Sequence, residues 1–262
     1  AGLRDFLTRL QDQELLPSDQ QSEFVRTHPL TRERVEAVIA NIDANGQTTT
    51  RPLPAAYTEA FNRVRSKLDG YIDPRGTLQR TSATATDFAT RYARALASHL
   101  TGDTRTALEL TDKLLREEPG NAYLYELKGQ ILFESGRVTE AVEPYRKAVS
   151  LSGGNALLRV GLAQALLNRN DAASMKDAVT ELETAITRER GSPLLWRLLA
   201  TAYGRQNQLG MAAYALSEEA LARGNKALAS QHAKRAQGLL QRGSSGWIKA
   251  GDVLAAAESK ED

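Results

Sequence analysis

A repeated spacing of small residues most strongly constrains how this chain can fold. Gly102 and Gly136 lie 34 positions apart, and Ala107 and Ala141 repeat that spacing. Less regular units follow toward the C-terminus, one of them lengthened near residues 171–174. Small residues at fixed positions let two helices approach closely, and a period of this length is typical of stacked helical hairpins.

The pattern inside each unit resembles the tetratricopeptide repeat. In the second unit an aromatic residue, a small residue and a leucine precede the turn, and alternating Ala and aromatic residues follow it: Tyr125, Lys128, Gly129, Leu132, Ala141, Tyr145 and Ala148. Trp196, Leu199-Ala200, Tyr203 and Ala212 repeat the pattern later. We expect Gly129, Ala141, Ala163, Ala200 and Ala212 where helix backbones meet. Stacked hairpins build a superhelix whose concave face can hold a partner.

The chain is predicted to be all-α, with two regions. Residues 1–80 form a helical lead-in, and residues 85–262 form the repeat array, closed by a capping helix that begins near Gly246. No window alternates with period two for long enough to indicate a strand. Three lead-in helices are predicted from apolar stripes: Leu3, Phe6, Leu7 and Leu10; Val35, Val38, Ile39 and Ile42; Tyr57, Phe61, Val64 and Leu68. Pro144 falls in a helical window, where it either removes an interior hydrogen bond or marks a first turn.

Composition excludes several classes of protein. The chain of 262 residues carries 34 Lys and Arg against 32 Asp and Glu, so bulk attraction to nucleic acid or an anionic membrane is not expected. No stretch is apolar over the roughly 20 residues that a membrane span needs. Cysteine is absent, which excludes disulfides, cysteine-ligated zinc and cysteine nucleophiles.

The motifs of catalysis are missing. The three histidines, His28, His99 and His232, are not part of an HExxH motif, so the zinc-binding arrangement on one helix face is absent. Neither a phosphate-binding GxxxxGK[ST] loop nor a GxSxG nucleophile elbow occurs. We therefore expect this chain to be non-catalytic, without a metal or cofactor of its own, and His99 and His232 to serve packing or to lie on the surface.

One lead-in segment points to a particular family. The run Thr27-His28-Pro29-Leu30-x-x-x-Arg34 follows Asp5-Phe6-Leu7-x-x-Leu10-Gln11 and precedes the repeats. With Tyr92-Ala93-Arg94-Ala95-Leu96 and Glu118-Pro119-Gly120-Asn121-Ala122, it resembles the C-terminal half of BepA-like zinc metalloendopeptidases of the bacterial periplasm. The resemblance covers essentially the whole chain.

That resemblance implies a parent zinc enzyme that cleaves misassembled envelope proteins or assists outer-membrane protein assembly. The repeats would recruit the substrate or assembly partner, in the periplasm. The His28 loop would lie over the zinc site of the missing N-terminal protease domain, where the imidazole would occupy the open metal position or contact substrate. Arg34 is expected to anchor this loop. The chain opens Ala1-Gly2-Leu3 without Met, so we expect a removed signal peptide or a piece of a longer protein, and the resemblance favours the piece.

A basic segment near the C-terminus is the other candidate site. No acidic residue occurs between Glu219 and Asp252, and we name as candidate partner-binding residues Arg223, Lys226, Lys234, Arg235 and Arg242. A solvated helix face would show the same pattern. Aromatic residues are not interleaved with these cations, which argues against nucleic acid as the partner.

Two functions from different classes remain open on the sequence. One is the non-catalytic, partner-recruiting half of a zinc endopeptidase. The other is a free-standing tetratricopeptide adaptor with no enzyme attached. Both would hold a protein or peptide in the concave repeat groove. An adaptor has no need for the amphipathic Phe6-Leu7-Leu10 stripe and the His28 loop ahead of its repeats, and this difference separates the two.

Overall fold

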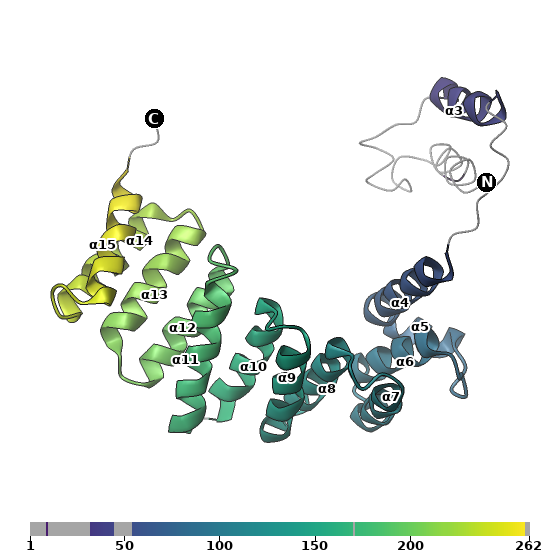
Figure 1. Cartoon of the computed structure of the whole chain (residues 1–262), viewed down its shortest axis with the longest axis horizontal. Coiled ribbons are helices and arrows are strands. Elements are labelled where there is room, and N and C mark those ends of the chain that lie inside the picture. Colours follow the sequence, from purple (N-terminus) through teal and green to yellow (C-terminus); the bar gives the residue numbers. More distant parts are fainter. Residues whose placement is uncertain (1–8, 10–31, 45–53, 170, 260–262) are drawn as a thin grey trace. The chain divides into compact units, whose positions relative to one another are not determined.

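The computed structural model describes residues 9, 32–44, 54–169 and 171–259, and every regular element in these ranges is an α-helix (Figure 1). The chain divides into two compact units, Ala1–Ala60 and Phe61–Asp262. The first unit contains α3 (Arg32–Ala44), the helix predicted from the Val35 stripe. The second begins within α4 (Ala55–Ile72) and contains all the repeats.

The repeats are five helical hairpins in chain order. Each hairpin has a first and a second helix that pack against each other, and α8 also packs beside α10, and α10 beside α12. Successive hairpins therefore contact mainly their neighbours, as the 34-residue spacing predicts. The helices are α6 (Phe88–Leu100) with α7 (Thr104–Glu117), α8 (Ala122–Glu134) with α9 (Val138–Leu151), α10 (Ala156–Arg169) with α11 (Ala172–Ile186), α12 (Pro193–Arg205) with α13 (Leu209–Ala222), and α14 (Lys226–Leu239) with α15 (Ser245–Glu258).

The turns and helix starts follow local chemistry. Gly102 and Gly136, between the helices of the first two hairpins, have φ of 88° and 81°, a left-handed conformation that favours glycine. Asn207 takes the same place in the fourth hairpin with φ 59°, a value that Asn tolerates better than most residues. Asp87 and Asp103 cap α6 and α7 by accepting from the backbone N–H of Thr90 at 2.8 Å and of Thr106 at 3.1 Å.

The small residues lie where the helices meet. Gly129, Ala141, Ala163 and Ala200 are buried as predicted, and Ala212 is half-buried. A Cβ at Gly129 would lie 2.8 Å from the Tyr145 ring, and one at Gly161 only 2.5 Å from it. The ring of Tyr145 on α9 is thus clamped between glycines of the adjacent helices α8 and α10.

The core extends along the whole array. One buried cluster fills the first hairpin and one face of α8, and a second extends from α8 to α15. Fully buried leucines occur from α7 to α12, at Leu114, Leu124, Leu162, Leu166, Leu182 and Leu195. Buried side chains of α14 are all alanines, Ala229, Ala233 and Ala236.

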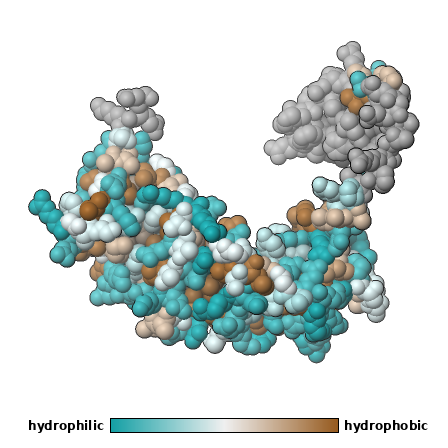
Figure 2. Space-filling model, in the orientation of Figure 1, coloured by the Kyte–Doolittle hydropathy of each residue, from teal (hydrophilic) through white to brown (hydrophobic). Residues whose placement is uncertain are grey.

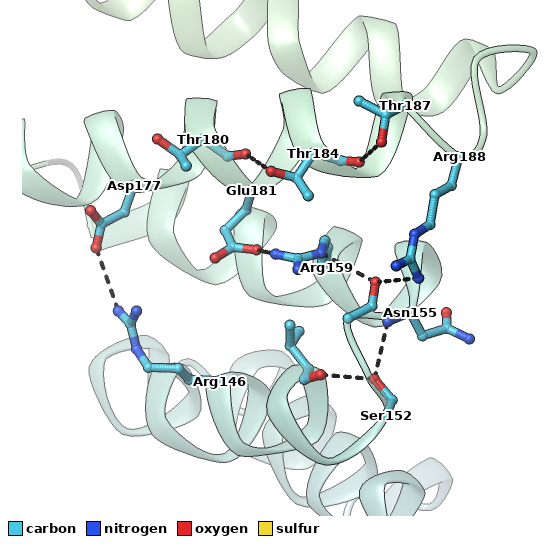
Figure 3. Close-up of polar contacts among 12 residues, drawn as sticks. Arg146, Ser152, Asn155, Arg159, Asp177, Thr180, Glu181, Thr184, Thr187 and Arg188 are labelled. Atoms are coloured by element: carbon cyan, nitrogen blue, oxygen red, sulfur yellow. Dashed lines mark hydrogen bonds and ion pairs between the residues drawn. The ribbon is translucent and has the colours of Figure 1, made fainter.

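Polar contacts link the second hairpin to the third and the two helices of the third hairpin to each other (Figure 3). Arg146 on α9 reaches Asp177 on α11 at 3.5 Å, and Arg159 pairs with Glu181. Arg188 donates to the carbonyl oxygen of Gly154 at 3.3 Å. These contacts join elements that already pack through the buried core. They therefore contribute more to the relative orientation of the helices than to stability.

The end of the lead-in packs with the repeats. Arg63 of α4 pairs with Glu118 at 2.6 Å and lies 4.0 Å over the ring of Phe88. After α4 comes the short helix α5 (Pro74–Arg80), and Arg94 on α6 donates to the Thr81 carbonyl oxygen at 2.7 Å. The lead-in predicted for residues 1–80 thus shares its last part with the packed repeat unit.

The structure refines two local expectations, which concern α4 and Pro144. The stripe of α4 forms a helix as predicted, and Gly70 lies within this helix, close to the backbone of Ala93. Pro144 lies in the interior of α9, not in its first turn. No helix in the described part of the chain is long and apolar enough to cross a membrane.

Candidate functional site

An open groove lies between the neighbouring first helices α8 and α10. Its volume is about 330 Å³. Five of its lining residues are apolar or aromatic, four carry carboxylate or amide groups, and one is glycine. The groove residues are Glu126, Gln130, Phe133 and Glu134 from α8, Leu157, Leu158, Val160, Gly161 and Gln164 from α10, and Tyr145 beneath them. We call this surface the α8–α10 groove.

Helical spacing places these residues on one face. On α8, Glu126, Gln130 and Phe133 follow one another at i, i+4 and i+7, and on α10 Leu157, Val160 and Gln164 fall at i, i+3 and i+7, the spacings that share a helix face. Gly161 leaves room for the buried Tyr145 ring, which forms the floor. The repeat pattern that packs the array therefore also shapes the groove.

The electrostatics of the groove centre on Glu126. Within the described residues no hydrogen bond or ion pair holds its half-buried carboxylate. Burial raises the pKa of Glu126, and the charge of Lys67 on α4 opposes that rise. The pKa of Tyr145 is also raised, by burial and then by the charges of Glu126 and Glu134. Both carboxylates thus act electrostatically on the same ring of the groove lining.

Glu134, in contrast, is held in place. Its carboxylate accepts from the Gln130 amide at 2.9 Å and lies 2.9 Å from the imidazole Nε2 of His99 on α6. The His99 side chain is 7% exposed, so this histidine contributes to packing, as the sequence analysis expected. Of the two groove carboxylates, only Glu126 has no hydrogen bond or ion pair within the described residues.

A second, smaller hollow of about 250 Å³ lies where α4, α6 and α8 meet. It is lined by Arg63, Val64, Lys67, Phe88, Tyr92, Asn121, Tyr123 and Leu124. Beside it, one face of α4 is apolar and exposed: Phe61, Val64, Leu68, Tyr71 and Ile72 are between 51% and 74% exposed. Figure 2 shows hydrophobic surface on α4 and another hydrophobic area over the α8–α10 region, both bordered by hydrophilic surface.

A larger groove of about 550 Å³ lies on the side of the second helices, between α7 and α9. Charged residues line it, and several of them already pair with each other. Lys128 lies 2.7 Å from Asp112, and Arg137 donates to Glu140 at 2.8 Å. Because several of these charges already pair with one another, they are less available to a bound partner than the Glu126 carboxylate of the α8–α10 groove.

The basic candidates lie on α14 and in the turns that flank it. Arg223 is 3.0 Å from the buried Glu219, which also binds Arg197, and Lys234 is 3.0 Å from Glu258. The Lys226 ammonium is 3.4 Å from the Ser259 carbonyl oxygen. Arg235 and Arg242 are exposed. Acidic residues from outside the basic segment thus offset part of its charge, and its role as a binding site remains a prediction.

The third group of candidates comprises His232 on α14 and the two lead-in residues His28 and Arg34. His232 is half-buried on α14, and burial, with the charges of Arg235 and Arg197, lowers its pKa. His28 lies outside the described residues. Arg34 falls within α3, but its side chain lies outside the described part. Among the described residues no three His, Asp or Glu side chains gather in a way that would hold a metal ion.

Comparison with known proteins supports the repeat interpretation. Residues 132–202 match the model of the tetratricopeptide repeat family. The array that contains this segment is an α-α superhelix. The structure named MamA MSR-1 C2 aligns with a TM-score of 0.53 and 18% identity over 64% of this chain and 96% of that one, and MamA AMB-1 P212121 with a TM-score of 0.53 and 17% identity over 63% and 98%. At these identities the likeness establishes the fold alone. No curated protein matches the sequence.

Sequence reasoning missed the groove residues. Glu126, Gln130 and Gln164 look like ordinary polar positions on helix faces. A signal was present, because the spacing that marks Gly129 as a contact position also assigns Glu126 and Gln130 to the face beside it. What the spacing did not reveal is that Glu126 has no counter-ion within the described fold.

Proposed function

We propose that this chain is a protein-interaction module that holds a segment of a partner protein on the face formed by its first helices. The α8–α10 groove carries the proposal, because it combines apolar walls, amide groups and a half-buried carboxylate without a counter-ion in the described fold. Leu157 at its rim is 72% exposed. Extended segments and helices are the partners that such helical grooves accept. Binding of such a segment is the function that the groups of this groove support.

Site-specific photo-crosslinking tests this function. A photoreactive phenylalanine analogue replaces Gln164 or Thr201 on the first helices, or Arg105 or Lys176 on the second helices, and the protein is irradiated in cells of its source. We expect defined protein adducts from the first-helix positions only. Equal labelling from both pairs of positions, or from the second-helix pair alone, would contradict the proposal.

A second candidate is the more specific one, in which the module recruits substrate or an assembly partner for a zinc endopeptidase of the bacterial periplasm. The run from Thr27 to Arg34 supports it, together with the exposed apolar face of α4, which a protease domain on the same polypeptide would cover. Zinc would then belong to that domain and not to this chain. A free-standing adaptor fits the repeats equally well.

The reading frame upstream of Ala1 separates the two candidates. An HExxH motif there supports the peptidase, and His28→Ala in the whole enzyme should then change proteolysis without altering the fold. Unchanged proteolysis would remove the regulatory role of His28 and leave recruitment standing. A frame without that motif would leave the adaptor as the function to pursue.

A further inference from the structure

The α8–α10 groove presents negative charge although the whole chain does not. The chain carries a formal charge of +2, so its overall field does not attract cations. Inside the groove, however, Glu126 and Glu134 both act on Tyr145 through their charge, and the groove lining contains no Lys, Arg or His. The charge of Lys67 lowers the pKa of Glu126, but Lys67 lines the neighbouring hollow and not this groove. The groove therefore carries negative charge, opposite in sign to the net charge of the chain.

The walls of the groove fit an aliphatic stem. Phe133, Leu157 and Val160 line it beside the Tyr145 ring, and Gln130 and Gln164 add amide groups. Lysine and arginine side chains bury their methylene groups along apolar surface while the charged head reaches a polar partner. A carboxylate that has lost part of its hydration gains most from such a head, because the pair forms away from bulk water.

We propose that the α8–α10 groove binds a lysine or arginine side chain of the partner's segment, flanked by apolar residues, with the cationic head at Glu126. This rests on the proposed function and names the chemistry of its partner. Glu134, already held by Gln130 and His99, contributes negative potential without moving. An acidic segment is repelled by the same two carboxylates, and an uncharged one leaves Glu126 without a counter-ion.

Three peptide pools test the proposal. Each pool contains nonapeptides with blocked ends, a fixed central lysine, norleucine or glutamate, and flanking positions drawn from Ala, Leu, Val and Ser. The pools are passed over the immobilised full chain, and retained peptides are quantified by mass spectrometry. We expect central-lysine peptides to be retained roughly tenfold more than norleucine peptides, and glutamate peptides least.

Substitutions at Glu126 identify the residue responsible. Glu126→Gln should abolish the preference for lysine over norleucine, and Glu126→Lys should turn it toward the glutamate pool. Glu109→Gln is the matched control: it removes the same charge from an exposed carboxylate on α7, and the lysine preference should persist. Thermal unfolding of each variant confirms that it is folded.

Failure of this inference is distinguishable from failure of the proposed function. Equal retention of the lysine and norleucine pools, or a lysine preference that survives Glu126→Gln, would overturn the inference. If Val160→Asp then abolishes that equal retention, the groove still binds segments and the proposed function stands. Retention of none of the pools also overturns the inference, while the crosslinking positions decide the proposed function separately.

Discussion

Glu126 carries its charge at a position where the described fold supplies no ion pair. The surrounding apolar groove makes the charged form costly, which raises the pKa of the carboxyl, and Lys67 offsets this only in part. By contrast, buried Glu219 is held by Arg197 and Arg223. A charged residue that lowers stability and lacks an ion pair is typical of a binding site. The group that binds a partner best is often not the group that would stabilise the fold best.

Glu126→Gln is expected to stabilise the protein at neutral pH. A carboxyl whose pKa is raised on folding is penalised in its charged form, so the penalty is complete well above its folded pKa and absent well below the unfolded value of about 4.3. The variant should raise the Tm by roughly 1–3 °C at pH 7, and this gain should disappear as the pH falls below about 4. Calorimetry across this range measures both, with Glu109→Gln as the control. A gain that does not change with pH would show that burial of the charge is not its cause.

At the scale of helices, close approach in the second and third hairpins depends on glycine. Tyr145 of α9 fills the space between Gly129 of α8 and Gly161 of α10, so three helices meet at one ring. The same ring forms the floor of the α8–α10 groove. Packing of the array and the shape of the groove are therefore set by the same contacts. Pro144 within α9 removes the backbone donor to Glu140, yet the helix continues because its buried face is packed on both sides.

Gly161→Ala is expected to destabilise the protein by about 1–2 kcal/mol. The added methyl group meets the buried Tyr145 ring, which has little freedom to move, and this overpacking outweighs the helix propensity gained by removing glycine. Gly204→Ala in α12 is the matched control, because nothing lies within 4 Å of its Cβ position. That variant should gain about 0.5–1 kcal/mol. Urea unfolding measures both changes, and opposite signs are the expected result.

At the scale of the whole molecule, stability is distributed along the repeat array. Each hairpin packs mainly on its neighbours, so central hairpins have partners on two sides and terminal ones on a single side. Fully buried leucines occur in every helix from α7 to α12 except α9, whereas α5 buries only Thr77. Local opening is therefore expected to become easier toward the ends of the array.

Hydrogen exchange tests this gradient. Backbone amides of α10 and α12 should exchange slowest under native conditions, and those of α5 at least roughly tenfold faster. Mass spectrometry of peptic fragments from the full chain gives both rates in one experiment. Uniform protection from α5 to α15 would mean that the array unfolds as a single unit and would contradict the nearest-neighbour description.

The sequence by itself determined the helices, the hairpin period and the positions where backbones meet. These features depend on residues a few positions apart, such as Gly129 with Leu132, and on one spacing repeated along the chain, so local chemistry reports them. The burial of Ala141 and Ala163 and the turns at Gly102 and Gly136 were predictable for that reason.

Only the tertiary structure decided which residues become functional surface. That Gly161 lies against Tyr145, that Glu126 stands without an ion pair in the described fold, and that Lys234 meets Glu258 each depend on how separate helices pack. The apolar stripe of α4 likewise predicts a buried face, yet its residues from Phe61 onward are exposed. Helix periodicity identifies the residues that share a face, whereas burial and free charge depend on what packs against that face.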